Sequence, residues 1–166
     1  MNKEHIQSVF SSDYDQYIQS IYRFAYIKVN SQYTAEEICS NVFTKYWQEL
    51  CKGSEIENPR AFLYKLARNA VIDFYRKRGR EATAPIEAGL ELGTTPSFIP
   101  AIEVSSDLEQ IKSAMCSLDQ EAQNAVIWHF LDDMPTKEIA KILGKSDGSV
   151  RTMISRSLKD IRSKLV

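Results

Sequence analysis

Polar and basic side chains recur along one side of a helical pattern near the C-terminus. They are Ser149, Arg151, Thr152, Ser155, Arg156 and Lys159. Guanidinium, ammonium and hydroxyl groups are the donors that proteins direct at DNA phosphates and base edges. The pattern therefore predicts a helix that reads DNA.

A helix-turn-helix would hold this helix in place. Ala140 is small where two helices must cross closely, Gly144 allows the turn, and Val150 would lock the second helix onto the first. Ser146 can cap the second helix, whose opposite side carries Val150, Ile154, Leu158 and Ile161. An ordinary packed hairpin with a solvated basic face has the same pattern, so the rest of the chain must decide.

Charge is segregated along the 166 residues, although the formal net charge is only −1. Residues 60–80 carry 7 basic and 1 acidic side chains, and residues 134–166 carry 8 and 3, whereas residues 1–59 carry 5 and 8 and residues 81–133 carry 1 and 10. The two basic blocks can neutralise phosphates. DNA would repel the acidic block, which is free for protein contacts or for occupying the basic surfaces. A solvated helix face could account for any one of these charge runs. It accounts less well for two basic blocks separated by an acidic one.

The first basic block interleaves aromatic rings with cations. Its members are Tyr64, Lys65, Arg68, Tyr75, Arg76, Lys77 and Arg78. This mixture suits single-stranded nucleic acid, whose bases stack on rings while its phosphates follow the charges. The polar loop from Lys52 to Asn58 could hold an extruded base, or it could be a solvated connector. Asp73 lies one turn before Arg76, so these two side chains can form a local ion pair instead of contacting nucleic acid.

Apolar residues at helical spacing predict an all-α fold with two small domains joined by a flexible linker. The first domain, residues 1–80, should contain helices from about Asp13 to Val29, from a capping box at Thr34 to about Leu50, and from Pro59 to about Arg78, with Gly79 as the stop. The linker, residues 81–105, contains three prolines and two glycines. In the second domain, residues 106–166, capping boxes should begin helices at Ser106 and Ser117, and the latter helix should reach about Leu131.

The remaining composition argues against catalysis, a metal site and a membrane span. Cys39, Cys51 and Cys116 are an odd number without ligand-like spacing, and no signal segment precedes them, so a reduced cytoplasmic protein is expected, with Cys39 packed in a core. No apolar run approaches the roughly 18 residues of a membrane helix. His5 and His129 belong to no metal-binding pair, and the chain has no phosphate loop or nucleophile motif. No cofactor is expected.

Two stretches together resemble a known family. Thr34–Trp47 followed by Pro59–Arg78 resembles region 2 of sigma-70-family RNA polymerase sigma factors, and Leu118–Leu165 resembles their region 4. With these two regions and a short linker, the chain resembles the extracytoplasmic function (ECF) subfamily. It departs from the usual pattern at Met153, where a basic residue is common, and at Ser40–Asn41, where glutamine and an acidic residue are common.

The resemblance implies roles for both domains. The helix from Thr34 would dock on the clamp helices of the largest polymerase subunit, through Glu36, Glu37, Ser40 and Asn41. The −10 promoter element would be melted and read by Lys52, Ser54, Asn58, Tyr64, Lys65, Arg68, Asn69, Arg76, Lys77 and Arg78. Region 4 would read the −35 element through Ser149, Arg151, Thr152, Ser155, Arg156 and Lys159 and contact the flap of the second-largest subunit.

The sequence therefore predicts an ECF-type sigma factor that binds core RNA polymerase and directs initiation at promoters with −10 and −35 elements. Family members are often held by an anti-sigma factor, frequently membrane-bound, and such a partner is expected here. The main alternative is a stand-alone helix-turn-helix regulator that binds a palindrome as a dimer. That regulator would have no need of an aromatic and basic single-strand surface.

Overall fold

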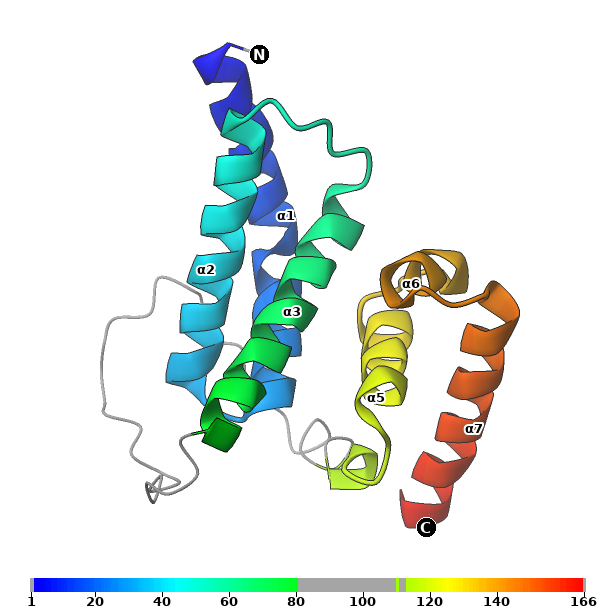
Figure 1. The fold of residues 1–166 in the computed structure, drawn as a ribbon. Coiled ribbons are helices and arrows are strands. Elements are labelled where there is room, and N and C mark those ends of the chain that lie inside the picture. Colours follow the sequence, from blue (N-terminus) through cyan, green and yellow to red (C-terminus); the bar gives the residue numbers. More distant parts are fainter. Residues whose placement is uncertain (1, 81–109, 111–112, 166) are drawn as a thin grey trace. The chain divides into compact units, whose positions relative to one another are not determined.

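The computed structural model describes residues 2–80, 110 and 113–165, and none of these lies in a β-strand. The described residues are almost entirely helical, as predicted. The chain divides into two compact units, Met1–Ile102 and Glu103–Val166 (Figure 1). The predicted linker, residues 81–105, and the start of the helix expected at Ser106 lie outside the described residues.

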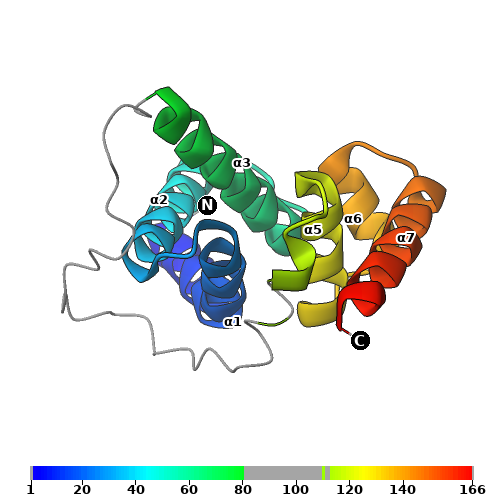
Figure 2. The same cartoon turned by 90° about the horizontal axis from the view of Figure 1, so that it is seen from below.

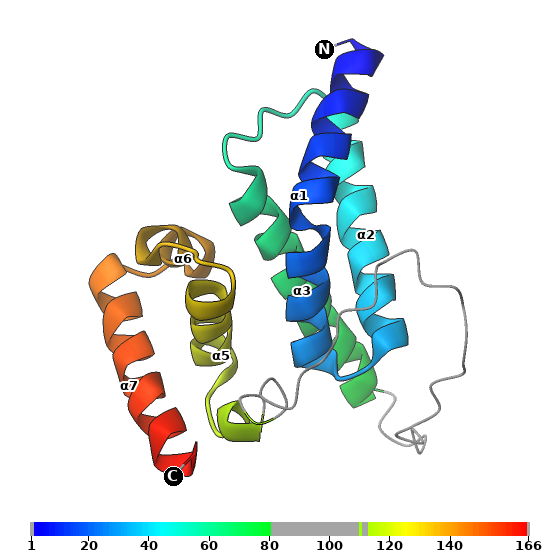
Figure 3. The same cartoon turned by 180° about the vertical axis from the view of Figure 1, so that it is seen from behind.

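The first unit is a bundle of three helices, α1 (Lys3–Val29), α2 (Gln32–Cys51) and α3 (Pro59–Arg80). Each helix contacts the other two, and Figure 3 shows α1 and α2 side by side. Its largest fully buried side chains include Ile21, Phe24, Tyr46, Leu63 and Tyr64. Burying these apolar groups is the main free-energy gain that holds the bundle together.

Two of the predicted helix starts in this unit are wrong. The first helix begins at Lys3 instead of Asp13, because the Asn2 side chain accepts a hydrogen bond from the Glu4 amide at 3.1 Å. The second begins at Gln32, and its cap is the Ser31 hydroxyl, which accepts from the Thr34 amide at 3.2 Å. Thr34 therefore does not form the predicted capping box.

The turns of α1 that precede the predicted start at Asp13 pack against α2. Phe10 packs edge-on against Trp47 with ring centroids 5.3 Å apart, and it also contacts Phe43 and Tyr46. The Tyr46 hydroxyl donates a hydrogen bond to the Asp13 carboxylate. Burial, followed by this bond, raises the pKa of Tyr46. These contacts join α1 to α2 along an aromatic face.

The α2 to α3 segment agrees more closely with the sequence prediction. Asn58 caps α3, since its side-chain oxygen accepts from the Ala61 amide at 3.0 Å, and Pro59 is the first helical residue. The helix does not stop at Gly79 but continues to Arg80. Cys39 is buried in the bundle, and burial raises the pKa of its thiol, so its predicted packing role is confirmed.

The second unit contains α5 (Gln120–Val126), a π-helix η1 (Ile127–Leu131), α6 (Thr136–Leu143) and α7 (Asp147–Leu165). In Figures 1 and 2, α7 packs on α6 and runs back past α5. The cap of α5 is Asp119, whose carboxylate accepts from the Ala122 amide at 2.8 Å. The predicted start at Ser117 is therefore wrong, while the predicted end at Leu131 is right.

The helix-turn-helix is confirmed. Gly144 ends α6 at φ 66, a left-handed conformation that glycine adopts without a steric penalty. Ala140 and Ile139 are buried on α6, and Val150 and Ile154 are buried on α7, so the two helices share one apolar core. One side of α7 is thereby fixed, and the other faces outward.

Candidate nucleic-acid interface

The outward side of α7 carries every residue that the sequence predicted for duplex reading. Ser149, Arg151, Thr152, Ser155, Arg156 and Lys159 are all exposed. They occur at helical spacing opposite the buried Val150, Ile154 and Ile161. Packing of the core therefore presents the whole set together to solvent.

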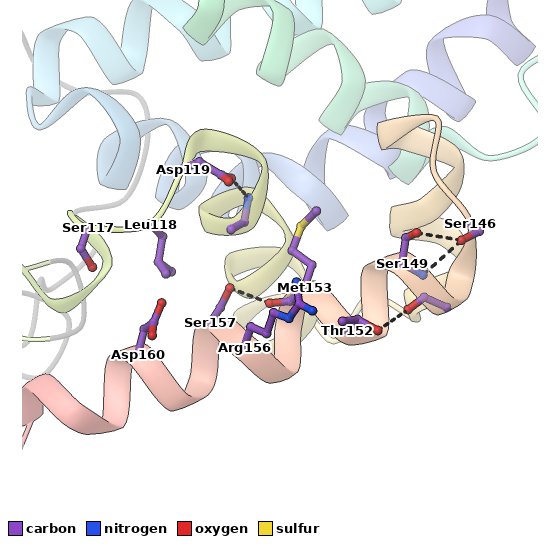
Figure 4. Close-up of a pocket in the computed structure, with 12 residues that line it drawn as sticks. Ser117, Leu118, Asp119, Ser146, Ser149, Thr152, Met153, Arg156, Ser157 and Asp160 are labelled. Carbon is purple, nitrogen blue, oxygen red and sulfur yellow. Dashed lines mark hydrogen bonds between the residues drawn. The ribbon is translucent and has the colours of Figure 1, made fainter.

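Local hydrogen bonds order the first turn of this helix. Ser146 is the predicted cap: its hydroxyl accepts from the Ser149 amide at 3.1 Å and donates to the Ser149 hydroxyl at 3.0 Å (Figure 4). The Thr152 hydroxyl donates to the carbonyl of Gly148 at 3.0 Å. The hydroxyls of Ser149 and Thr152 can each still accept a further hydrogen bond, for example from the amino group of a base.

An open groove runs along one side of α7 toward the start of α5 (Figure 4). Met153, the half-buried departure from the family pattern, lines this groove beside Arg156. Asp119 and Asp160 also line it, and their carboxylates disfavour a close phosphate. The basic surface of α7 is thus bounded on this side by negative charge.

Arg151 has a defined carboxylate partner on its own helix. Its Nη2 lies 2.7 Å from Oδ2 of Asp147, four residues earlier. Oδ1 of Asp147 accepts a hydrogen bond of 2.5 Å from the Thr136 hydroxyl on α6. Neither Thr136 nor Asp147 was predicted from the sequence as a site residue. The spacing of Asp147 and Arg151 could have indicated their pair, whereas the bond to Thr136 arises from the tertiary fold.

The α3 surface is also basic, and its Arg76–Asp73 ion pair is long and exposed. Lys65, Asn69, Arg76, Lys77 and Arg78 are exposed, and Arg68 is half-buried. The Arg76–Asp73 pair is 3.7 Å long with both side chains about two-thirds exposed, so it contributes little to stability. It is the local pair that the sequence suggested for Asp73.

The placement of Tyr64 on this surface is wrong. Its side chain is fully buried and packs edge-on against Phe24, with ring centroids 6.1 Å apart. It lies on the same side of α3 as the buried Ala67 and Val71, three and seven residues later. A base cannot stack on Tyr64 while the bundle is folded.

Tyr75, the other aromatic residue predicted on this surface, is 42% exposed, so part of its ring is accessible to a base. Its hydroxyl donates to the backbone carbonyl of Lys28 near the end of α1. Burial raises the pKa of this hydroxyl, so it stays protonated over the neutral range. The ring is therefore anchored at its polar tip while part of its surface faces solvent.

The loop between α2 and α3 is tied to the end of α2. Lys52 Nζ lies 3.0 Å from Oε1 of Glu49, and the Ser54 hydroxyl donates to Oε2 at 2.9 Å. These two bonds, that from Lys52 first, lower the pKa of the Glu49 carboxyl. Gly53 permits the turn at φ 81. Lys52, Ser54 and Asn58 all have local partners, so a base held in this loop must share or replace them.

The predicted polymerase contacts form a ridge on α2 between two grooves. Glu37, Ser40 and Asn41 are exposed and Glu36 is half-buried. Glu37 and Asn41 line a groove that also contains Lys45 of α2 and Asp73, Phe74, Lys77 and Arg78 of α3. Ser40 lines an apolar groove on the other side, with Phe10, Tyr14, Phe43 and Trp47. The ridge therefore borders a charged groove through Glu37 and Asn41 and an apolar groove through Ser40.

Metal-binding side chains do not gather in the described parts of the chain. Across residues 2–80, 110 and 113–165 there is no group of three or more His, Cys, Asp or Glu side chains that could hold a metal ion. Within the same ranges no helix is long and apolar enough to cross a membrane. The Nδ1 of the half-buried His129 lies 2.9 Å from the carbonyl oxygen of Met134.

Comparison with known sequences gives two family matches, in order along the chain. Residues 14–81 match the model described as Sigma-70 region 2, and residues 108–161 match that described as Sigma-70, region 4. The chain is 26% identical over 160 residues to the ECF RNA polymerase sigma factor BldN of Streptomyces coelicolor, covering 92% of this chain and 58% of BldN. It is 25% identical over 175 residues to the ECF RNA polymerase sigma factor SigW of Bacillus subtilis, covering 98% and 92%. The chain therefore spans little more than half of BldN but most of SigW.

Two solved structures share the fold. The sigma factor RpoE, in complex with the anti-sigma factor NepR from Bartonella quintana, has a TM-score of 0.73 at 23% identity, covering 94% of this chain and 96% of that one. CnrH, in complex with the cytosolic domain of CnrY, has a TM-score of 0.69 at 18% identity, covering 96% and 88%.

Proposed function

The chain belongs to the sigma-70 family of RNA polymerase sigma factors, as a member of the ECF subfamily, and we propose on this basis that it binds core RNA polymerase and directs initiation at its own set of promoters. We assign polymerase binding and the −10 element to residues 1–80, and the −35 element to residues 106–166. Residues 81–105 connect them. The protein contributes recognition, and the polymerase contributes the chemistry.

One observation carries the proposal: a single chain holds two separately packed units, each matching a different sigma region and each exposing a basic helix. A stand-alone helix-turn-helix regulator needs only the second unit. The first unit adds a cationic surface with a partly exposed ring, which suits an opened strand better than a duplex. Two sites on one chain can engage two promoter elements at once.

The exposed residues suggest which nucleic-acid contacts each helix makes. On α7, Arg156 and Lys159 can contact phosphates, while Ser149, Arg151 and Thr152 near the start of the helix can reach base edges. On α3, Lys65, Arg76, Lys77 and Arg78 can follow the phosphates of the opened strand. The α2 ridge and its two grooves offer the surface for core polymerase.

An anti-sigma partner is part of the proposal. RpoE was solved with the anti-sigma factor NepR, and CnrH with the cytosolic domain of CnrY. By analogy, we expect a partner that covers the surfaces this chain uses for polymerase, and we expect the chain to act in the cytoplasm, where its polymerase lies.

Run-off transcription tests the proposal directly. The purified chain is combined with core polymerase from the same cells, and transcripts from fragmented genomic DNA are mapped. We expect start sites that share two upstream motifs at a fixed separation, and no opening of DNA by the chain alone. Absence of initiation together with tight dimeric binding to a palindrome would favour the stand-alone regulator.

A further inference from the structure

The Asp147 carboxylate lies where the two helices of the helix-turn-helix meet. One oxygen accepts a hydrogen bond from Thr136 at the start of α6, at 2.5 Å, and the other lies 2.7 Å from Nη2 of Arg151 on α7. Both carboxylate oxygens are thus engaged, by donors from different helices. The orientation of the Arg151 guanidinium is tied to the packing of α6 against α7.

The local sequence makes this arrangement possible. Pro135 occupies the capping position of α6 and makes no side-chain capping bond, and Thr136 is the first helical residue. Its hydroxyl instead reaches across to α7. Asp147 is the first residue of α7, where a carboxylate interacts favourably with the helix dipole and lies one turn before Arg151.

Asp147 and Arg151 differ in how much of each side chain is exposed to solvent. The Asp147 side chain is 27% exposed, whereas that of Arg151 is 65% exposed. The carboxylate is therefore partly shielded and held, while the guanidinium extends outward. Among the described residues, neither of the other cations predicted to read DNA on α7, Arg156 and Lys159, has a carboxylate within ion-pair distance.

We propose that Asp147, held by Thr136, aims Arg151 at a base pair and so determines which promoters this chain selects. A guanidinium without a fixed partner is free to turn toward a nearby phosphate, which carries no sequence information. A guanidinium with one edge on a carboxylate keeps its remaining donors for a pair of acceptors such as O6 and N7 of guanine. The carboxylate also repels phosphates, so it weakens the sequence-independent part of DNA binding.

This inference rests on the proposed function and makes Asp147 a positioning residue that acts through Arg151. Replacing Asp147 with asparagine removes one negative charge beside the DNA and loosens the guanidinium. Total binding to DNA should then be retained or increase, while discrimination at one base pair decreases. A merely structural role would reduce both together.

The test uses the full chain reconstituted with core polymerase on a promoter library randomised across the −35 element. Transcripts are sequenced for the wild type and for Asp147→Asn, Thr136→Val, Arg151→Ala and the double variant Asp147→Asn/Arg151→Ala. We expect Asp147→Asn to reduce the preference at one base pair by about tenfold, and Thr136→Val to reduce it less. In the Arg151→Ala background, Asp147→Asn should change the preference no further.

A matched control is Asp133→Asn. Asp133 is exposed, lies in the same unit, and adopts φ 51, which asparagine tolerates, so the change removes the same charge without touching Arg151. It should leave the preference unchanged. An equal loss in Asp133→Asn, or an unchanged preference in both Asp147→Asn and Thr136→Val, would overturn the inference.

Two further outcomes are distinguishable. If the wild type gives no promoter-dependent transcripts, the proposed function fails before the inference is reached. If thermal unfolding shows that Asp147→Asn does not fold, Thr136→Val carries the test, because it removes one hydroxyl and leaves the Asp147–Arg151 pair in place. Unchanged selection by a folded Thr136→Val would then reject the proposal that Thr136 holds Asp147 to aim Arg151.

Discussion

The two basic helices, α3 and α7, carry similar charges in different settings. On α7 the key ion pair is short, at 2.7 Å, and its carboxylate is also bonded to a second helix. On α3 the corresponding pair is 3.7 Å long with both partners about two-thirds exposed. Reading a base edge requires a fixed donor, whereas following a flexible strand requires charge at the right spacing. The geometry of each helix suits a different one of these tasks.

The sharpest contrast within α3 is between its two tyrosines, and it gives the largest expected effect. Tyr64→Ala should lower the free energy of unfolding of the first unit by about 3–5 kcal/mol, because it removes a fully buried ring. Tyr75→Ala removes the same atoms from a ring that is 42% exposed and should cost less. Urea unfolding of both variants measures the difference. Equal losses would mean that Tyr64 is not the core residue described above.

Arginine substitutions should separate the duplex and single-strand surfaces. Arg156→Ala should weaken promoter binding about equally across sequences and lower its salt dependence, because Arg156 is assigned to a phosphate. Arg76→Ala should instead slow promoter opening. A template already melted around the −10 element should restore initiation by Arg76→Ala but not by Arg156→Ala. Restoration of both or of neither would contradict the division between α3 and α7.

The effect of the hydrogen bond that anchors Tyr75 can be measured separately from the effect of its exposed ring. Tyr75→Phe keeps the ring but removes the hydrogen bond to the Lys28 carbonyl, which should cost about 0.5–1.5 kcal/mol of stability. Strand opening at a temperature where the variant is folded should be nearly unchanged if the ring face does the stacking. Tyr75→Leu, which loses the ring as well, is the comparison that should reduce opening.

The smallest effect is expected in the loop between α2 and α3. Because hydrogen bonds from Lys52 and Ser54 lower the pKa of Glu49, their stabilisation is present above the ordinary glutamate pKa and is lost as pH falls through the lowered value. Glu49→Gln should therefore increase amide hydrogen exchange in residues 52–58 at neutral pH by a few fold, with little change in global stability. The wild type should approach the variant only in the acidic range. A pH-independent difference would show that the Glu49 charge does not hold the loop.

The helix-turn-helix was predictable because short-range spacing defines it. Ala140, Gly144 and Val150 each meet a steric requirement within eleven residues, and the outward set on α7 follows from the buried one. The position of Tyr64 was predicted wrongly because an aromatic ring suits both a core and a base stack. The spacing of three and seven residues to the buried Ala67 and Val71 favours the core, and the packing of Phe24 against Tyr64 confirms it.

Features that depend on distant partners were not predictable from spacing. The first ten residues of α1 are mostly polar, and their helix is explained by Phe10 packing on α2. The bond between Thr136 and Asp147 joins residues eleven apart across a turn whose geometry the sequence does not specify in detail. Helix caps were ambiguous for a simpler reason, since Ser31 and Thr34 carry the same functional group three residues apart.

The unbroken run of α3 from Lys65 to Arg78 has a consequence for the length of nucleic acid that it can contact. From Lys65 to Arg78 the exposed cations extend over about 20 Å, taking 13 steps at about 1.5 Å each. A stacked nucleic-acid strand advances about 3.4 Å per nucleotide, so this row of charges matches the length of about six nucleotides. If this surface holds the opened strand as proposed, the length of this unbroken helix sets the number of bases that it addresses at a time.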